Sequence, residues 1–124
     1  MQRIFRTKGF SRWMAKTGLT DSALCKAVAE IEQGLVEANL GGYLFKKRIA
    51  LSGRGKSGGA RTIVATRFEE RWFFLYGFKK NERSTIPDAE LEVLQERADV
   101  YFSFDECQLA TALKIKDLVE VHCG

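Results

Sequence analysis

The side chains best suited to chemistry are basic, and they gather in the middle of the chain. The segment 46–83 holds eleven Lys and Arg residues against three Glu residues, a net charge of +8 in a protein of 124 residues whose total charge is +4. The flanks carry a net +2 over residues 1–45 and a net −6 over residues 84–124. Because a local field depends on where charge lies, the middle third is predicted to attract polyanions, and nucleic acid is the first partner to consider.

Three short stretches supply the cations of interest. They comprise Lys46, Lys47 and Arg48, then Arg54, Lys56 and Arg61, then Lys79, Lys80 and Arg83. In an extended strand alternate side chains point to opposite faces, so Lys46 and Arg48 are predicted to share the solvent side and Lys47 to point the other way. Convergence of three separate stretches favours phosphate binding over the alternative, a solvated basic face that only aids solubility.

The inventory of catalytic residue types restricts the chemistry. No His, Cys or carboxylate pair accompanies these cations, and His122 lies near the C-terminus, so a conventional His-based ribonuclease is disfavoured. Cations can still cleave RNA through its 2′-hydroxyl, because Arg stabilises charge on the scissile phosphate and a crowded Lys can act as a base. Such a site needs neither metal nor cofactor.

A glycine-rich run, Gly53–Gly58, matches the pattern GxGxxG and ends like a phosphate-binding loop. Both nucleotide-binding motifs need a helix after the glycines, whose N-terminus holds the phosphate. Here a strand-like segment follows at Arg61, which excludes both motifs. The residues Ser52–Gly59 are therefore predicted to form a hairpin loop, either as a mobile soluble tip or as a phosphate-contacting loop.

The hydrophobic pattern indicates helices on both sides of a sheet. Thr20 is a suitable N-cap for a helix that is predicted to end before Gly41-Gly42, with apolar residues at Leu24, Val28, Ile31 and Leu35. Ile4-Phe5 indicates a short first strand before a helical turn around Trp13. After the sheet, Pro87 opens a second helix through Leu91, Leu94, Ala98 and Tyr101. Ser103–Glu106 resembles a capping box for a third helix, and Leu118–Val121 is predicted to be extended.

Three runs rich in β-branched or aromatic residues predict the sheet: Tyr43–Leu51, Ala60–Arg67 and Arg71–Phe78. Short connections favour an antiparallel meander. The predicted fold class is α+β, an antiparallel sheet of three to four strands packed by N-terminal and C-terminal helices. The whole chain, 1–124, is predicted to be one domain with an acidic helical C-terminal extension at about 104–124.

The cysteines and the N-terminus bear on the compartment. Cys25, Cys107 and Cys123 are scattered and show no ligand-like spacing, so neither a disulfide framework nor a zinc site is expected. The N-terminal residues alternate basic and apolar types and lack the continuous apolar segment of a secretion signal or membrane span. A reducing cytoplasm, away from any membrane, is the expected location.

The combined pattern resembles one known family. The runs KKRIA at 46–50, GRGKSGGART at 53–62 and FFLYGFKKNER at 73–83 are similar to the RelE/HigB-type toxins of bacterial type II toxin–antitoxin systems. The resemblance implies a metal-independent mRNA endoribonuclease that inhibits translation, commonly on the ribosome. It also implies a cognate antitoxin that neutralises the toxin in a hetero-oligomer.

The resemblance also implies roles for single residues. Arg61 matches the arginine that stabilises the phosphate transition state, and Lys80 with Arg83 matches a basic pair of which one acts as acid. Lys46, Lys47 and Arg48 match strand cations that bind RNA or assist proton transfer, and Arg54, Lys56 and Lys79 are added as RNA contacts. The sequence departs from many relatives after Arg83, where no Tyr or His follows closely. Two alternatives stay open: a ParE-like toxin that inhibits DNA gyrase without cleaving RNA, and a non-catalytic RNA- or DNA-binding module.

Overall fold

The computed structural model describes residues 2–51, 55–83 and 85–124, with four helices and six strands in that part of the chain. Their order is β1 (Arg3–Thr7), α1 (Lys8–Ala15), α2 (Asp21–Glu32), β2 (Ala38–Gly41), β3 (Leu44–Leu51), β4 (Gly55–Ala65), β5 (Arg71–Lys79), α3 (Asp88–Phe102), α4 (Glu106–Lys114) and β6 (Leu118–Val121). The strands form one sheet in the order β2-β3-β4-β5-β1-β6. The predicted α+β class is confirmed.

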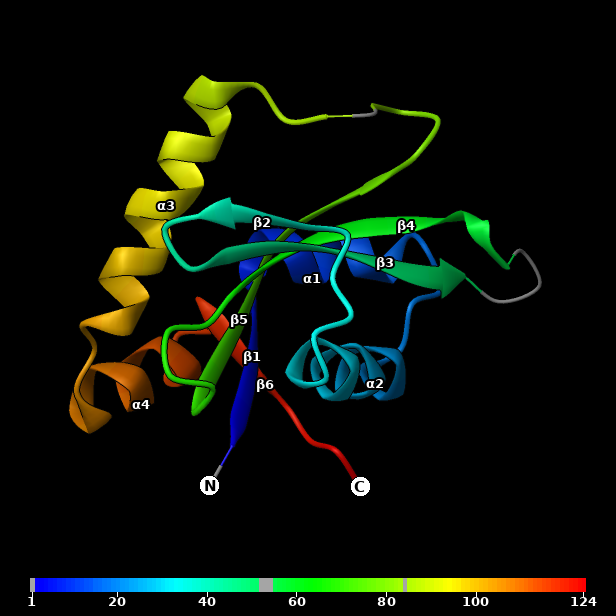
Figure 1. The fold of residues 1–124 in the computed structure, drawn as a ribbon. Coiled ribbons are helices and arrows are strands. Elements are labelled where there is room, and N and C mark those ends of the chain that lie inside the picture. The colour runs from blue at the N-terminus through cyan, green and yellow to red at the C-terminus, as the bar shows by residue number, and fades with distance from the viewer. Residues whose placement is uncertain (1, 52–54, 84) are drawn as a thin grey trace.

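The sheet is mixed. The run β2 to β5 is an antiparallel meander, as predicted, whereas β1 pairs parallel with β5 and antiparallel with β6. The prediction of three to four antiparallel strands was too low: the extended segment predicted at Leu118–Val121 joins the sheet as β6, and β2 lies where the helix was predicted to continue. The two terminal strands therefore lie side by side, as Figure 1 shows.

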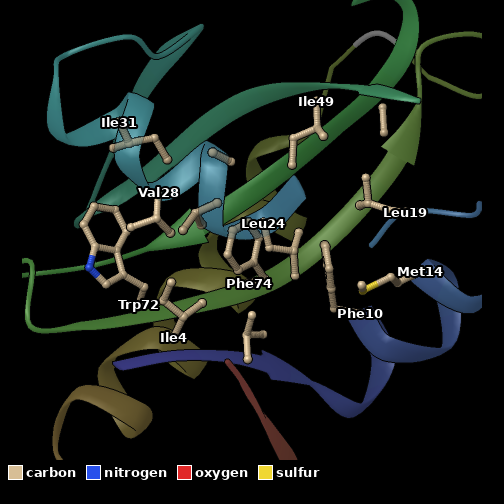
Figure 2. Packing of buried hydrophobic residues seen from close by; sticks show 14 of the residues in the cluster. Ile4, Phe10, Met14, Leu19, Leu24, Val28, Ile31, Ile49, Trp72 and Phe74 are labelled. Carbon is tan, nitrogen blue, oxygen red and sulfur yellow. The ribbon is translucent and has the colours of Figure 1, made fainter. Parts of the chain in front are cut away.

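Two layers of helices cover the sheet. One face packs against α1 and α2, with Phe10, Leu24 and Val28 buried together with Trp72 and Phe74. Figure 2 shows these rings and aliphatic side chains meeting over the sheet. The other face packs against α3 and α4, which lie together on one side of the sheet in Figure 1. Because β5 has helices on both faces, its apolar run is nearly continuous.

The second core reaches into the acidic C-terminal segment. Leu109 of α4 and Leu118 of β6 are fully buried beside Phe5 and Phe73. The segment predicted as an extension therefore supplies part of the core. Its helix begins with a capping box formed by Asp105 and Gln108, two residues later than the predicted box at Ser103–Glu106.

Two element boundaries were wrong. Thr20 does cap α2, but the helix ends at Glu32 and the chain turns at Gly34, whose φ is +86°. The predicted continuation toward Gly41-Gly42 is instead an irregular segment followed by β2. The strand β4 also starts earlier than predicted, at Gly55, which pairs with Leu51 of β3 beyond a register shift between Ile49 and Leu51.

A disulfide joins Cys25 on α2 to Cys123 after β6. The expectation that these cysteines stay unpaired was wrong, because the fold brings together two residues that are 98 positions apart in the sequence. Their Cα atoms lie 5.8 Å apart, within the normal range for a disulfide. Cys107 is free and exposed on α4.

Candidate nucleic-acid interface

Arg61 lies at the centre of the sheet, on the face that carries α3 and α4. Ile63 and Ala65 extend from the same face of β4 into the core, and Arg61 continues this row beyond the helices. Its side chain is only 6% exposed, and its Nε lies 3.2 Å from the Glu37 carboxylate. Among the described residues, the buried Nη1 atom of Arg61 has no hydrogen-bond partner. A buried donor without a partner is costly, so this guanidinium N–H is an unsatisfied group in the interior of the sheet face.

Glu37 organises the cations around Arg61. Its carboxylate lies 3.9 Å from Lys46 Nζ, 3.2 Å from Arg48 Nε and 3.2 Å from Arg61 Nε. Its backbone N–H donates to the Lys46 carbonyl at 2.9 Å, which fixes Glu37 beside β3. We call these four residues the Glu37 cluster. Three cations against one carboxylate leave it with a net charge of +2.

The cations of β3 divide between the two faces of the sheet. Lys46 and Arg48 share the face of Arg61, and Arg48 lies directly opposite Arg61 in the strand register with its side chain 46% exposed. Lys47 points into the other face, where its Nζ lies 2.9 Å from Glu30 and donates to the Leu35 carbonyl at 2.8 Å. Lys47 therefore joins α2 to β3 and lies away from the Glu37 cluster.

The cations at the end of β5 and in the turn after it lie beside the Glu37 cluster. Lys79 pairs in register with Ala60, next to the pair of Arg61 and Phe78, and Lys80 is exposed in the following turn. Arg83 donates to Tyr76 Oη at 3.1 Å and to both oxygens of Glu90 at 3.0 and 2.8 Å. The hydrogen bonds to Glu90 and Tyr76 raise the pKa of Arg83 above its usual value. The Arg83 guanidinium is therefore held in place by Tyr76 and Glu90.

Two grooves border this region. A groove of about 360 Å³, which we call the α3 groove, lies between Tyr76 and the first half of α3 and is lined by apolar side chains and Glu90. A second groove of about 440 Å³, the α1 groove, runs between α1, the end of β5 and α3. Arg83 lines the α1 groove and Tyr76 lines both. Arg83, which is hydrogen-bonded to Tyr76 and Glu90, thus lies beside both grooves.

Comparison with known families decides the identity of the chain. The model of the RelE toxin of the RelE/RelB toxin–antitoxin system matches residues 2–121. The chain belongs to the RelE toxin family. No curated protein matches it. The predicted family is thereby confirmed over nearly the whole length of the chain.

Membership of the RelE family implies a cognate antitoxin as partner. The described part of this RelE-family chain contains no group of three or more His, Cys, Asp or Glu residues placed to hold a metal ion. It also contains no helix that is long and apolar enough to cross a membrane. Of the predicted RNA contacts, Arg54 lies outside the described residues, and Lys56 is described only by its backbone within β4.

Sequence reasoning missed Glu37, whose carboxylate pairs with all three cations of the Glu37 cluster. The predicted helix ran through this position, so Glu37 was not placed beside the cations of β3. A signal was available, because Gly34 can end a helix and Gly41-Gly42 can form a tight turn between two strands. A hairpin around that turn places Glu37 beside Lys46 and Arg48.

Proposed function

We propose that this RelE-family toxin is a metal-independent mRNA endoribonuclease that inhibits translation. The observation that carries the proposal is the buried, unpartnered Nη1 of Arg61 inside a cluster of net charge +2. Glu37 binds the guanidinium at Nε, and in this proposal the side chains that cover Nη1 move aside when RNA binds, so that Nη1 donates to an oxygen of the scissile phosphate. Arg48 opposite Arg61 is the exposed cation that meets the RNA first.

The proposed reaction is an internal phosphoryl transfer. The 2′-oxygen of the RNA attacks the adjacent phosphorus, the bond from phosphorus to the 5′-oxygen breaks, and the products carry a 2′,3′-cyclic phosphate and a 5′-hydroxyl. The 2′-hydroxyl loses a proton and the leaving 5′-oxygen gains one. Negative charge grows on the phosphate oxygens in the transition state, and a fixed arginine that binds these oxygens lowers the barrier.

The two basic residues after β5 take different roles in this proposal. Arg83 is fixed by Glu90 and Tyr76 and holds its proton strongly, so it attracts the RNA backbone without transferring a proton. Lys80 is exposed, and it is our candidate for the group that protonates the leaving oxygen. Lys46 completes the strand wall with its Nζ near Glu37.

Induced expression in a bacterial host tests the proposal. The wild-type protein should arrest growth and fragment mRNA, and co-expression of the antitoxin should prevent both effects. Arg61→Ala should relieve the arrest, whereas Arg67→Ala, at an exposed arginine near the other end of β4, should leave it intact. If cells that express Arg61→Ala still stop growing while their mRNA stays intact, the arrest does not come from RNA cleavage and the proposal is rejected. A DNA supercoiling assay would then test the ParE-like alternative.

A further inference from the structure

A row of cations along α1 and its C-cap has no ion-pair partner in the described part of the chain. Lys8, Arg12 and Lys16 are all exposed and form no ion pair with any described residue. Arginines elsewhere in the described chain commonly have a carboxylate partner, as Arg48, Arg61 and Arg83 do. We call these three unpaired residues the α1 stripe.

The helix geometry places the α1 stripe beside the α1 groove. At about 100° per residue, the three cations fall within an arc of about 80°, and Gly9 and Trp13 come next around the helix. Gly9 and Trp13 line the α1 groove together with the buried Phe10, and Met14 lies farthest round and is buried in the core. The stripe therefore forms the outer rim of the groove that Arg83 lines on its other side.

The wall of the α1 groove includes a close contact between the Trp13 ring and the backbone of β5 at Gly77. A Cβ atom added at Gly77 of β5 would lie 2.3 Å from the ring of Trp13, so glycine lets the half-buried indole lie against the strand. Half-buried aromatic rings beside cations are the surface on which bases of single-stranded RNA stack. The Glu82 carboxylate in this groove is already occupied, because it accepts a hydrogen bond from the Lys79 backbone at 2.8 Å.

Helix electrostatics does not explain the stripe. Arg12 and Lys16 lie near the C-terminal end of α1, where cations are favoured. Lys8, however, is the first residue of the helix, where a cation is disfavoured, and no acidic residue occupies the first turn. Like charges at spacings of four also repel one another. An external polyanion relieves both costs.

We propose that the α1 stripe and the α1 groove bind the RNA strand beyond the phosphate at Arg61. This inference rests on the proposed function for its ligand and adds a second segment to the binding path. The strand passes from the Glu37 cluster over Lys79, Lys80 and Arg83, enters the α1 groove beside Trp13, and lays its phosphates along the stripe. Affinity therefore depends on RNA length.

Fluorescence anisotropy with 2′-O-methyl RNA tests the inference independently of cleavage, because this RNA lacks the attacking hydroxyl. The double variant Arg12→Gln/Lys16→Gln should bind an RNA of about 12 nucleotides roughly tenfold more weakly at low salt, with little change for an RNA of about 4 nucleotides. Its plot of log affinity against log salt should lose about 1.4 units of slope, since each phosphate contact contributes about 0.7.

The matched control is Arg67→Gln/Lys114→Gln, which removes the same two charge types from exposed positions off the proposed path. Circular dichroism should show that both variants fold. Equal weakening by the two variants, or no weakening by the α1 variant, would overturn the inference. If the wild-type protein binds the long RNA through α1 but cleaves no unmodified RNA, the proposed function fails and the binding path stands.

Discussion

The substitution Glu37→Gln should change fold stability and RNA affinity in opposite directions. In the native protein one carboxylate, 24% exposed, holds three cations, one of which is nearly buried. Glutamine has the same shape and can still accept a hydrogen bond, but it carries no charge. The change should destabilise the fold, because the Arg61 guanidinium loses its counter-charge. It should also strengthen RNA binding, because three cations are left without their carboxylate.

The magnitude follows from the distances. A unit charge pair at 3.2 Å has a gross attraction of about 5 kcal/mol at an effective dielectric constant of 20. Removing one partner of a fully buried pair costs about 3–5 kcal/mol. Because Glu37 and Arg48 are partly exposed and glutamine keeps a hydrogen bond, we expect a net loss of about 2 kcal/mol. For a chain of this size, that lowers Tm by about 8 °C.

Two assays measure the two effects. Thermal unfolding should show the lower Tm, and anisotropy with 2′-O-methyl RNA at low salt should show about fivefold tighter binding, equivalent to about 1 kcal/mol. The control is Glu92→Gln, which removes one negative charge from an exposed position on α3 and should change neither value much. Unchanged stability and unchanged affinity in Glu37→Gln would refute the assignment of Glu37 as the counter-ion of the phosphate site.

Three further predictions follow from other parts of the fold. Reducing the bond between Cys25 and Cys123 should lower the free energy of unfolding by up to about 4.7 kcal/mol, because it opens a loop of 98 residues; urea denaturation with and without dithiothreitol measures this. Gly59→Ala should cost about 1–3 kcal/mol, since its Cβ would lie 2.4 Å from a carbonyl oxygen of β3, whereas Gly9→Ala meets nothing within 4 Å and should not destabilise α1. The hydrogen bond from the Arg83 guanidinium lowers the pKa of Glu90. The stabilisation that this ion pair gives the fold is therefore complete above pH 4.5 and is lost as the pH falls through the lowered pKa of Glu90. Acid unfolding of Glu90→Gln should therefore show a weaker dependence on pH in that range.

Elements that depend on interactions between neighbours in the sequence could be predicted from the sequence. Thr20 caps a helix because its hydroxyl accepts the Ala23 N–H, an interaction between neighbours in the sequence. The alternation around Lys46 and Arg48 correctly placed both on one face of β3 and Lys47 on the other. The central strands could be predicted because their apolar residues pack on helices that cover both faces.

Features set by tertiary contact could not be predicted in this way. Leu35 fits the helical spacing of α2 but is 54% exposed, because the backbone turns at Gly34. The segment Ser52–Gly59 has the composition of a loop, yet β4 begins within it at Gly55, and Gly59 lets β4 approach β3 more closely than any side chain allows. The disulfide and the pairing of Glu37 with Arg61 join residues whose proximity depends on the complete sheet.

The central claim is that Arg61 binds the scissile phosphate, and cleavage by the purified protein tests it most directly. The assay uses mRNA on translating ribosomes in excess EDTA, and it follows the appearance of fragments with a 2′,3′-cyclic phosphate. Loss of one transition-state donor should make Arg61→Ala about 10²–10³-fold slower than wild type, while Arg67→Ala stays close to wild type. Cleavage by Arg61→Ala at the wild-type rate would contradict the account.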